Sequence, residues 1–260
     1  MQVCVGTSGW QYRDWRGALY PAKLPQREWL AHYASVFGCV EVNNTFYNLP
    51  SEDAVRRWHE QTPRDFQFVL KASRYLTHTR RLREPEAPVH TMLERFRPLG
   101  ARLAVFLLQL PPSLKVDVER LAETLTQFPK RVRVAVEFRD ASWFSDEVRG
   151  VLAAHNAALC VTDRQAESAE PDWHDVSWMY LRFHEGDGRP APCYRGATLE
   201  TWAERIALQQ SRATMVYAFF NNDTHCCAPR DAAMLARACA ERGLDVSRAP
   251  APEAVPLSRD

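Results

Sequence analysis

Eight short runs rich in β-branched and aromatic residues recur along the chain, and helical patterning follows most of them. The runs show little alternation of apolar and polar residues, which is typical of parallel strands covered on both faces. They begin at Val3, Cys39, Gln67, Arg102, Arg133, Ala158, Trp178 and Thr214. Strand and helix repeat about every 30 residues, as expected for βαβ units. The pattern predicts an α/β fold, a (β/α)8 barrel of the TIM type with an eight-stranded parallel sheet. A doubly wound open sheet is the alternative.

Seven segments between the runs are predicted to be helices. Ser51 and Ser145 stand where an N-cap is expected, and acidic residues follow each of them in the first turn. Gly243 is placed to end the last helix. The segments are 25–37, 51–61, 87–100, 117–128, 145–156, 198–210 and 229–243. Residues 164–177 are too polar and too short for a helix, so the barrel should be somewhat irregular after its sixth strand.

The barrel accounts for residues 1–243 as a single domain, and the Pro- and Ala-rich residues 244–260 are predicted to be a loosely ordered C-terminal tail. A length of 260 residues is normal for such a barrel. The formal net charge of +1 gives no global field that would draw the chain to nucleic acid or a membrane. We expect no signal peptide and no membrane span, because a basic start and a long apolar stretch are both missing.

Seven cysteines occur without a CxxC pair, which indicates neither a zinc knuckle nor a disulfide framework. Cys4, Cys39 and Cys160 fall in apolar strand runs, where a free cysteine behaves as a small core residue. The adjacent Cys226 and Cys227 are interpreted as incidental, because disulfide geometry is strict. This usage favours a reduced, cytoplasmic compartment.

Polar and charged side chains gather at the C-terminal ends of the predicted strands, where barrel enzymes have their active sites. In the run 133–139, Glu137 and Arg139 share one side of an otherwise apolar strand, because strand side chains alternate. A buried charge needs either a partner or a polar cavity. The other strand ends carry Ser8, Glu41, Asn43, Thr45, Lys71, Gln109, Asp163, Arg182, His184, Asn221, Asn222 and Asp223. Each has a structural explanation, such as a brace or a cap, but one shared pocket explains them together.

Aromatic and basic residues surround the predicted mouth of the barrel, which is the opening at the C-terminal ends of its strands. Trp10, Trp15, Tyr47 and Trp143 each follow a strand end, where aromatic rings can stack on a sugar or a base. The basic loop 71–83 is either a solvated loop or a rim that binds phosphate or carboxylate.

Seven motifs of the chain resemble those of the YecE-like family, which carries a domain-of-unknown-function label. They are VGTSGWQYRDWRGALYP, VEVNNTFYNLP, FVLKASRYLTH, LLQLPP, VEFRDASW, YLRFH and YAFFNND, in this order from about Val3 to Leu235. The resemblance implies a TIM-type barrel without an assigned reaction, and its patterned positions coincide heavily with the strand-end set. The chain departs from the family at Glu185, where glycine is usual. It also departs at Cys226-Cys227, where glycine and an aromatic residue are expected, so the turn after the last strand should differ.

The favoured hypothesis is an enzyme of the hydrolase or isomerase type, acting on a polar anionic small molecule such as a sugar derivative. Glu137 would be the general base or nucleophile, and Glu41 or Asp163 the second carboxylate. In a glycosidase these carboxyl groups should lie about 5 to 9.5 Å apart. The candidate catalytic residues are Glu137, Glu41, His184, Asp163 and Lys71, and the candidate substrate-binding residues are Arg139, Arg182, Asn43, Asn221, Asn222, Trp10, Trp143 and His78.

Three alternatives stay open. The first is a metal-assisted phosphodiesterase or nucleic-acid-processing protein, which the net charge does not support. In it a divalent metal would draw on Glu41, Glu137, Asp163, His184 and Asp223, although no metal motif such as HExxH occurs and no metal ligand or cofactor is assigned. The second is a non-catalytic metabolite binder. The third is a Schiff-base role for Lys71. The sequence does not indicate an oligomeric state.

Overall fold

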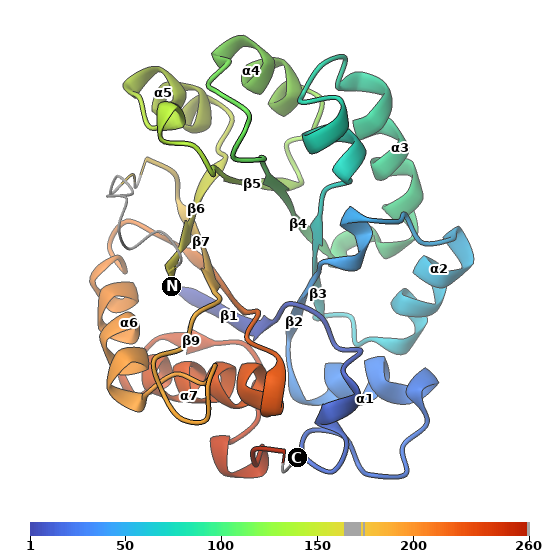
Figure 1. The fold of residues 1–260 in the computed structure, drawn as a ribbon, viewed down its shortest axis with the longest axis vertical. Coiled ribbons are helices and arrows are strands. Elements are labelled where there is room, and N and C mark those ends of the chain that lie inside the picture. Colours follow the sequence, from blue (N-terminus) through green and yellow to red (C-terminus); the bar gives the residue numbers. More distant parts are fainter. Residues whose placement is uncertain (164–172, 174, 259–260) are drawn as a thin grey trace.

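All eight predicted strands are present and parallel in the structure, a computed structural model that describes residues 1–163, 173 and 175–258. They are β1 (Gln2–Thr7), β2 (Cys39–Val42), β3 (Gln67–Lys71), β4 (Leu103–Gln109), β5 (Arg133–Glu137), β6 (Ala158–Thr162), β7 (Trp178–Phe183) and β8 (Met215–Phe220). A short further strand, β9 (Asp245–Val246), gives the sheet order β2-β3-β4-β5-β6-β7-β8-β1-β9. The sheet curls into a ring with the helices outside it (Figure 1), which confirms the predicted barrel.

The seven predicted helices also form. They are α1 (Trp29–Val36), α2 (Glu52–Gln61), α3 (Glu86–Phe96), α4 (Val118–Thr126), α5 (Asp146–Ala154), α6 (Gly196–Leu208) and α7 (Cys227–Glu241). The two predicted N-caps are confirmed, since Ser51 accepts from the backbone N–H of Ala54 at 3.2 Å and Ser145 from that of Val148 at 3.3 Å. The expected loop at 164–177 lies largely outside the described residues. No helix of the described part is long and apolar enough to cross a membrane.

The barrel closes between β1 and β2 through a side chain, because the described sheet has no ladder between these two strands. The Tyr33 hydroxyl accepts from the N–H of Thr7 at 3.0 Å and donates to the carbonyl of Cys39 at 3.1 Å. Gly6 permits this close approach, since a Cβ at that position would lie 2.5 Å from the Cys39 carbonyl oxygen. One tyrosine hydroxyl thus takes the place of a backbone hydrogen bond across the junction of β1 and β2, which we call the seam.

The chain beyond Gly243 is ordered, so the expectation of a loosely ordered tail is wrong for its described part. Strand β9 pairs in parallel with the start of β1, and the N–H of Ser247 donates to the carbonyl of Val3 at 2.8 Å. On the other side of the seam, the N–H of Gly38 donates to the carbonyl of Arg248 at 2.7 Å. Val255 is buried farther on. The Pro and Ala content of residues 244–260 predicts a loose tail, but composition does not show that these residues cover the gap between β1 and β2.

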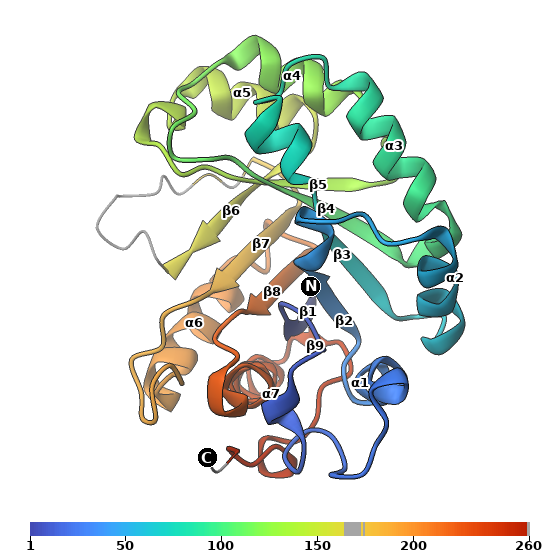
Figure 2. The same ribbon diagram turned by 45° about the vertical axis from the view of Figure 1, so that its right-hand side comes forward.

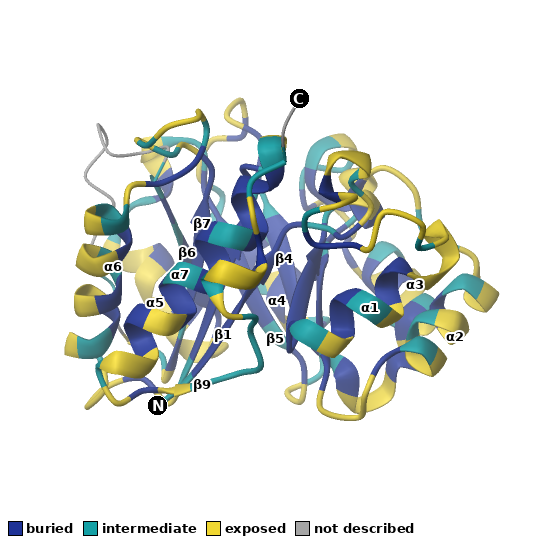
Figure 3. Cartoon of the chain, turned by 90° about the horizontal axis from the view of Figure 1, so that it is seen from below, coloured by how far each residue is buried: buried dark blue, intermediate teal, exposed yellow. Residues whose placement is uncertain are grey.

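The core has two layers, one between the sheet and the helices and one inside the barrel. Figure 3 shows buried strands at the centre and helices whose outer sides are exposed. The lumen is filled by side chains of alternate strand positions, including the predicted core cysteines Cys4, Cys39 and Cys160. The lower lumen is filled mainly by apolar side chains, and the buried glutamates lie at the C-terminal end of the strands.

One disulfide joins Cys193, in the loop after β7, to Cys227 at the start of α7. The interpretation of Cys226 and Cys227 as an incidental pair is therefore wrong for Cys227, whereas Cys226 is a buried free thiol. The two bonded cysteines are 34 residues apart, so no short sequence motif predicts the bond. The disulfide ties the loop after β7 to the turn after β8, at the same end of the barrel as the polar strand ends.

Candidate functional site

The strand ends β2, β3, β5 and β7 place four charged side chains in the upper lumen. These are Glu41, Lys71, Glu137 and Arg182, and they lie two residues beyond apolar lumen positions of the same strands because side chains alternate. Figure 2 shows these strand ends from the side, in the order in which the sheet curls. Strands far apart along the chain thus contribute to one cluster.

Arg182 is the centre of this cluster. Its Nη1 donates to Oε2 of Glu137 at 2.7 Å, and its Nη2 donates to Oε1 of Glu41 at 2.8 Å. Glu41 also accepts from the hydroxyl of Tyr180 at 2.5 Å and from that of Ser8 at 2.7 Å. Both glutamates are 0% exposed and Arg182 is 2% exposed. Such pairing of opposite charges is what charges in a protein interior require.

Arg139 extends the cluster toward solvent. Its Nε donates to Oε1 of Glu137 at 2.6 Å, and a second guanidinium nitrogen contacts the same oxygen. The side chain is 25% exposed, so the outermost guanidinium can be reached from outside. We call the four side chains linked in space in the order Glu41, Arg182, Glu137 and Arg139 the buried charge chain. Glu137 and Arg139, which the sequence predicts to lie on one side of a strand, are in contact and form one end of this array.

The electrostatics of the buried charge chain do not suit Glu137 as a general base. Burial alone would raise the pKa of Glu137, but Arg182 and Arg139 outweigh burial and bring the pKa down to about 2. For Glu41, too, burial is outweighed by Arg182, and the pKa is lowered. Both carboxylates are ionised at neutral pH and fully occupied. The guanidinium of Arg182 also fills the space between them, where a glycosidic bond would have to lie.

Lys71 lies beside the buried charge chain without joining it. Its Nζ sits 4.6 Å from the centroid of the Phe46 ring, and it forms no ion pair with any residue in the described part. Burial and the nearby Arg182 lower the pKa of Lys71 to about 8, although Glu41 and Glu137 oppose this shift. The side chain is partly exposed. Lys71 is therefore a reachable amine that is close to its titration point at neutral pH.

An amide relay leads from Arg182 to His184. Arg182 donates to Oδ1 of Asn43 at 3.3 Å, and the Nδ2 of Asn43 donates to Oδ1 of Asn221 at 3.1 Å. The Nδ2 of Asn221 lies 3.1 Å from Nδ1 of His184. The structure thus brings Asn43, Asn221 and His184 to the same mouth as the buried charge chain.

Asp163 and Asn222 form hydrogen bonds to groups outside the buried charge chain. Asp163 accepts from the backbone N–H groups of His184 and Glu185, at 2.9 and 3.0 Å, and from the hydroxyl of Tyr194. Asn222 is buried and donates to the carbonyl of Pro192 at 3.0 Å. Asp163 therefore caps the start of the loop after β7, which is the structural alternative to a catalytic carboxylate.

The predicted aromatic platform is wrong for Trp10 and Trp143, because both are buried in the outer core. Trp143 stacks on Phe138 with the ring centroids 4.9 Å apart. Its Nε1 donates to the carbonyl of Leu114 at 2.7 Å. Trp10 packs edge-on against Trp58. The turn after each strand directs the ring away from the lumen, which residue type and position along the chain do not reveal.

The basic loop is partly used within the protein. His78 lies in the wide turn Tyr75–Thr79, with its Nδ1 2.9 Å from the Thr77 hydroxyl. Burial and the positive charges of Arg74 and Lys71 lower the pKa of His78. Arg80 pairs with Glu84, and Arg81 donates to a backbone carbonyl. Arg80 and Arg81 are therefore engaged within the protein, so the basic loop does not act as a whole as an anion-binding rim.

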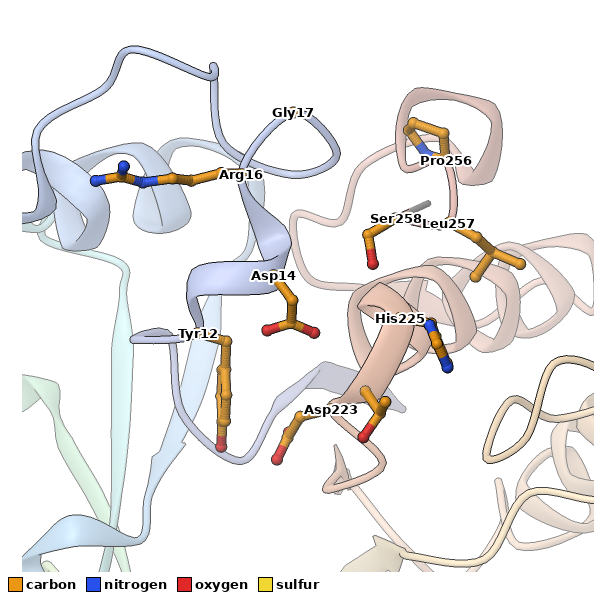
Figure 4. A pocket seen from close by; sticks show the side chains of 10 residues that line it. Tyr12, Asp14, Arg16, Gly17, Asp223, His225, Pro256, Leu257 and Ser258 are labelled. Atoms are coloured by element: carbon orange, nitrogen blue, oxygen red, sulfur yellow. The ribbon is translucent and has the colours of Figure 1, made fainter. Parts of the chain in front are cut away.

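A cleft next to the mouth was not anticipated from the sequence. It has a volume of about 930 Å³ and lies between the loop after β1 and residues 256–258 of the C-terminal segment. Tyr12, Asp14 and Asp223 face one another in it, whereas Arg16 points away (Figure 4). Burial, with the charges of Asp14 and Glu41, raises the pKa of Asp223 to about 7. Asp223 is a strand-end residue, and only its neighbours in space could have shown that it titrates near neutrality.

The five acidic and histidine residues considered as metal ligands do not assemble. In the described residues no three His, Cys, Asp or Glu side chains group in a way that could hold a metal ion. Glu41 and Glu137 are bridged by Arg182, and Asp163 is bound to backbone N–H groups.

Comparison with known proteins adds the family context. A family model described as "Protein of unknown function DUF72" matches residues 4–256. The UPF0759 protein YecE of Escherichia coli K12 is 36% identical over 117 residues, which are 45% of this chain and only 43% of that relative. The UPF0759 protein YunF of Bacillus subtilis is 25% identical over 256 residues, covering 85% of this chain and 89% of YunF.

A solved structure has the same fold. The crystal structure of a DUF72 family protein from Thermotoga maritima superposes with a TM-score of 0.77 at 29% sequence identity. The alignment covers 91% of this chain and 98% of that protein.

Proposed function

This chain belongs to the DUF72 family, and we propose that it is an enzyme of the isomerase or hydrolase type that binds a small anionic molecule at the C-terminal mouth of its barrel. The observation that carries the proposal is Lys71, a reachable cation beside a buried charge chain whose own charges are paired. An anionic sugar derivative is an example of such a molecule.

The charges around Lys71 favour an anion. The two carboxylates of the buried charge chain are matched by its two guanidinium groups, so Lys71 adds a positive charge without a partner in the described residues. Arg139 keeps N–H groups near the surface, and guanidinium groups bind carboxylate and phosphate well. A carboxylate or phosphate between Lys71 and Arg139 would complete the pairing.

The titration properties of the mouth favour proton transfer. A general acid or base works best with a pKa near the working pH. Lys71 and Asp223 meet this condition, with pKa values of about 8 and about 7, whereas Glu137 does not. His184, at the end of the amide relay, is a further group able to carry a proton. Isomerisation by proton transfer therefore fits the mouth better than glycoside hydrolysis with Glu41 and Glu137.

Calorimetric titration tests the binding step. Inorganic phosphate and a panel of sugar phosphates and hydroxy acids are titrated into the protein, with the uncharged sugars as reference. Binding should be confined to the anions and should weaken about tenfold or more in Arg139→Gln and in Lys71→Met, which corresponds to about 1.4 kcal/mol. Lys130→Met is the matched control, because Lys130 is exposed just before β5, at the opposite end of the barrel.

Solvent exchange tests the reaction. Anions that bind are incubated with the protein in D2O, and NMR follows replacement of carbon-bound hydrogen by deuterium. The proposal predicts catalysed exchange for at least one anion and its loss in Lys71→Met. Equal affinity for charged and uncharged sugars, or anion binding that is the same in all three variants, would contradict the proposal.

A further inference from the structure

We propose that Lys71 is a nucleophile that forms an iminium linkage with the carbonyl group of an aldehyde or ketone carrying a carboxylate or phosphate. This inference rests on the proposed function, because the same mouth must bind the anion, and it narrows the substrate to anionic carbonyl compounds. It assigns covalent catalysis to a residue that would otherwise serve as a positive charge.

The position of Lys71 is that of a nucleophile at a barrel mouth. It is the last residue of β3, where it pairs with Leu107 of β4 and directly follows Leu70, the partner of Val42 at the end of β2. The Phe46 ring covers one side of its amine. The other three lysines, Lys23, Lys115 and Lys130, are all exposed. Lys71 is therefore the one lysine amine that is partly withdrawn from water in the described chain.

The carboxylates near Lys71 are not available to hold it as an ammonium ion. Glu41 and Glu137 are saturated by Arg182, Arg139, Tyr180 and Ser8. A lysine that is desolvated or next to another cation is activated as a nucleophile, and Lys71 is both. With its pKa lowered to about 8, roughly a quarter of Lys71 is neutral at pH 7.5. For an ordinary lysine, with a pKa of 10.5, the neutral fraction is about one in a thousand.

The covalent step balances without a further reactant. The lone pair of neutral Nζ attacks the carbonyl carbon, a C–N bond forms, and the carbonyl oxygen takes the proton released from nitrogen to give a carbinolamine. A second proton, from solvent or from His184, leaves with that oxygen as water. The product is a protonated iminium ion, so one proton is consumed and one water is released.

The surrounding groups suit the steps that follow. The positive iminium nitrogen withdraws electrons through the former carbonyl carbon, so a base at the mouth can remove a C–H proton from the neighbouring α-carbon, and the electron pair of that bond moves toward nitrogen to give an enamine. Arg139 is placed to hold the carboxylate or phosphate of the same molecule. The buried charge chain stays ionised throughout, since Glu137 has a pKa of about 2. Its two carboxylates therefore take no proton from the linkage, and the base that removes the C–H proton is another group at the mouth.

Reductive trapping tests the inference on the full chain. The protein is mixed at pH 7.5 with pyruvate, glyoxylate, dihydroxyacetone phosphate or glyceraldehyde 3-phosphate, with acetone as the uncharged probe, and sodium borohydride is added. Mass spectrometry measures the stable secondary amine and locates it by peptide mapping. We expect at least one anionic probe to label Lys71 on the order of two hundredfold faster than any of the three exposed lysines, as the ratio between the neutral fraction of Lys71 and that of an ordinary lysine predicts. Acetone should label it at least tenfold more slowly than that probe.

Two variants and one parallel measurement separate the outcomes. Lys71→Arg keeps the positive charge and must lose the adduct, while Lys130→Arg must keep it. Labelling spread evenly over all four lysines, or an adduct that persists in Lys71→Arg, would overturn the inference. Calorimetric binding of inorganic phosphate is measured on the same preparation. Phosphate binding without any Lys71 adduct refutes the iminium and leaves the proposed function standing, whereas the absence of both refutes the two together.

Discussion

Replacing Arg182 by methionine should reveal how much the buried charge chain depends on its central guanidinium. Arg182 donates to Glu41 at 2.8 Å and to Glu137 at 2.7 Å, and all three side chains are almost fully buried. Methionine preserves much of the volume and removes the charge. Glu137 keeps Arg139, but Glu41 keeps only the hydroxyl groups of Tyr180 and Ser8. The cost therefore falls mainly on Glu41.

The expected magnitude follows from two independent estimates. Breaking a buried ion pair by removing one partner costs about 3–5 kcal/mol. Glu41 can escape part of that cost by taking up a proton. Protonating a carboxyl group with an ordinary pKa of 4.5 at pH 7 costs about 3.4 kcal/mol, at 1.36 kcal/mol per pH unit. We expect Arg182→Met to lose about 3–5 kcal/mol of unfolding free energy at pH 7.

The pH dependence of the unfolding free energy distinguishes a loss caused by the unpaired charge of Glu41 from a loss caused by packing. In the native protein the pKa of Glu41 is lowered, so its stabilisation is fully present above the unfolded pKa of 4.5 and adds no slope between pH 5 and 7. In Arg182→Met the folded state binds a proton that the unfolded state releases. The variant should then gain about 1.4 kcal/mol of stability per unit as the pH falls from 7 to 5, relative to the native protein.

Urea denaturation at pH 5, 6 and 7 measures both quantities. Adding Glu41→Gln to the variant should abolish the relative pH slope, because no carboxyl group is then left to titrate. Arg149→Met is the matched control, since Arg149 forms a solvent-accessible pair with Asp175 and its loss should leave the unfolding free energy nearly unchanged at all three pH values. A loss in Arg182→Met that is equally large at pH 5 and pH 7 would refute the charge argument and leave only a packing defect.

Three further predictions concern the seam and the cleft. Gly6→Ala places a Cβ 2.5 Å from the Cys39 carbonyl oxygen and should cost more than about 2 kcal/mol in urea denaturation. Gly150→Ala, in the open middle of α5, should instead gain about 0.5–1 kcal/mol. Tyr33→Phe removes the hydroxyl that bridges β1 and β2 and should cost about 1–3 kcal/mol, with faster amide hydrogen exchange at the seam. The folded pKa of Asp223 is raised to about 7, so its carboxylate costs stability increasingly as the pH rises above the unfolded value of 3.8. Asp223→Asn should therefore raise the thermal midpoint at pH 8 relative to the native protein, and more than at pH 5.

The order of elements could be predicted from local physics. A parallel strand covered on both faces must be apolar throughout, so the eight strand runs stand out from the helices between them. The period of two predicts that Glu137 and Arg139 share one side of the run 133–139. In the structure Arg139 lies just beyond the end of β5, and its Nε donates to Oε1 of Glu137 at 2.6 Å. The helix starts at Ser51 and Ser145 followed from the need of each first turn for an acceptor. These features depend on residues that are close together along the chain.

The features that were missed depend on contacts distant along the chain. Strands β2, β5 and β7 are not neighbours in the sheet, so no ladder register shows that Arg182 meets both Glu41 and Glu137. The bond of Cys193 to Cys227 and the pairing of β9 with β1 likewise join separate parts of the chain. Trp143 was misplaced for a local reason, because the short helix Ala141–Trp143 turns the ring onto Phe138.

The strand-end carboxylates and the reactive group of a barrel need not be the same residues. Glu137 has the residue type and the position of a general base, yet the two arginines that make its burial tolerable also lower its pKa to about 2. Lys71 has no such partner in the described residues, and the same burial brings its pKa to about 8. Burial disfavours the charged form of both residues, but in Glu137 the paired arginines outweigh burial, whereas Lys71 has no paired carboxylate to do so in the described residues. The pairing of the two glutamates with arginines leaves Lys71, together with Asp223 in the neighbouring cleft, as groups whose protonation can change during a reaction at neutral pH.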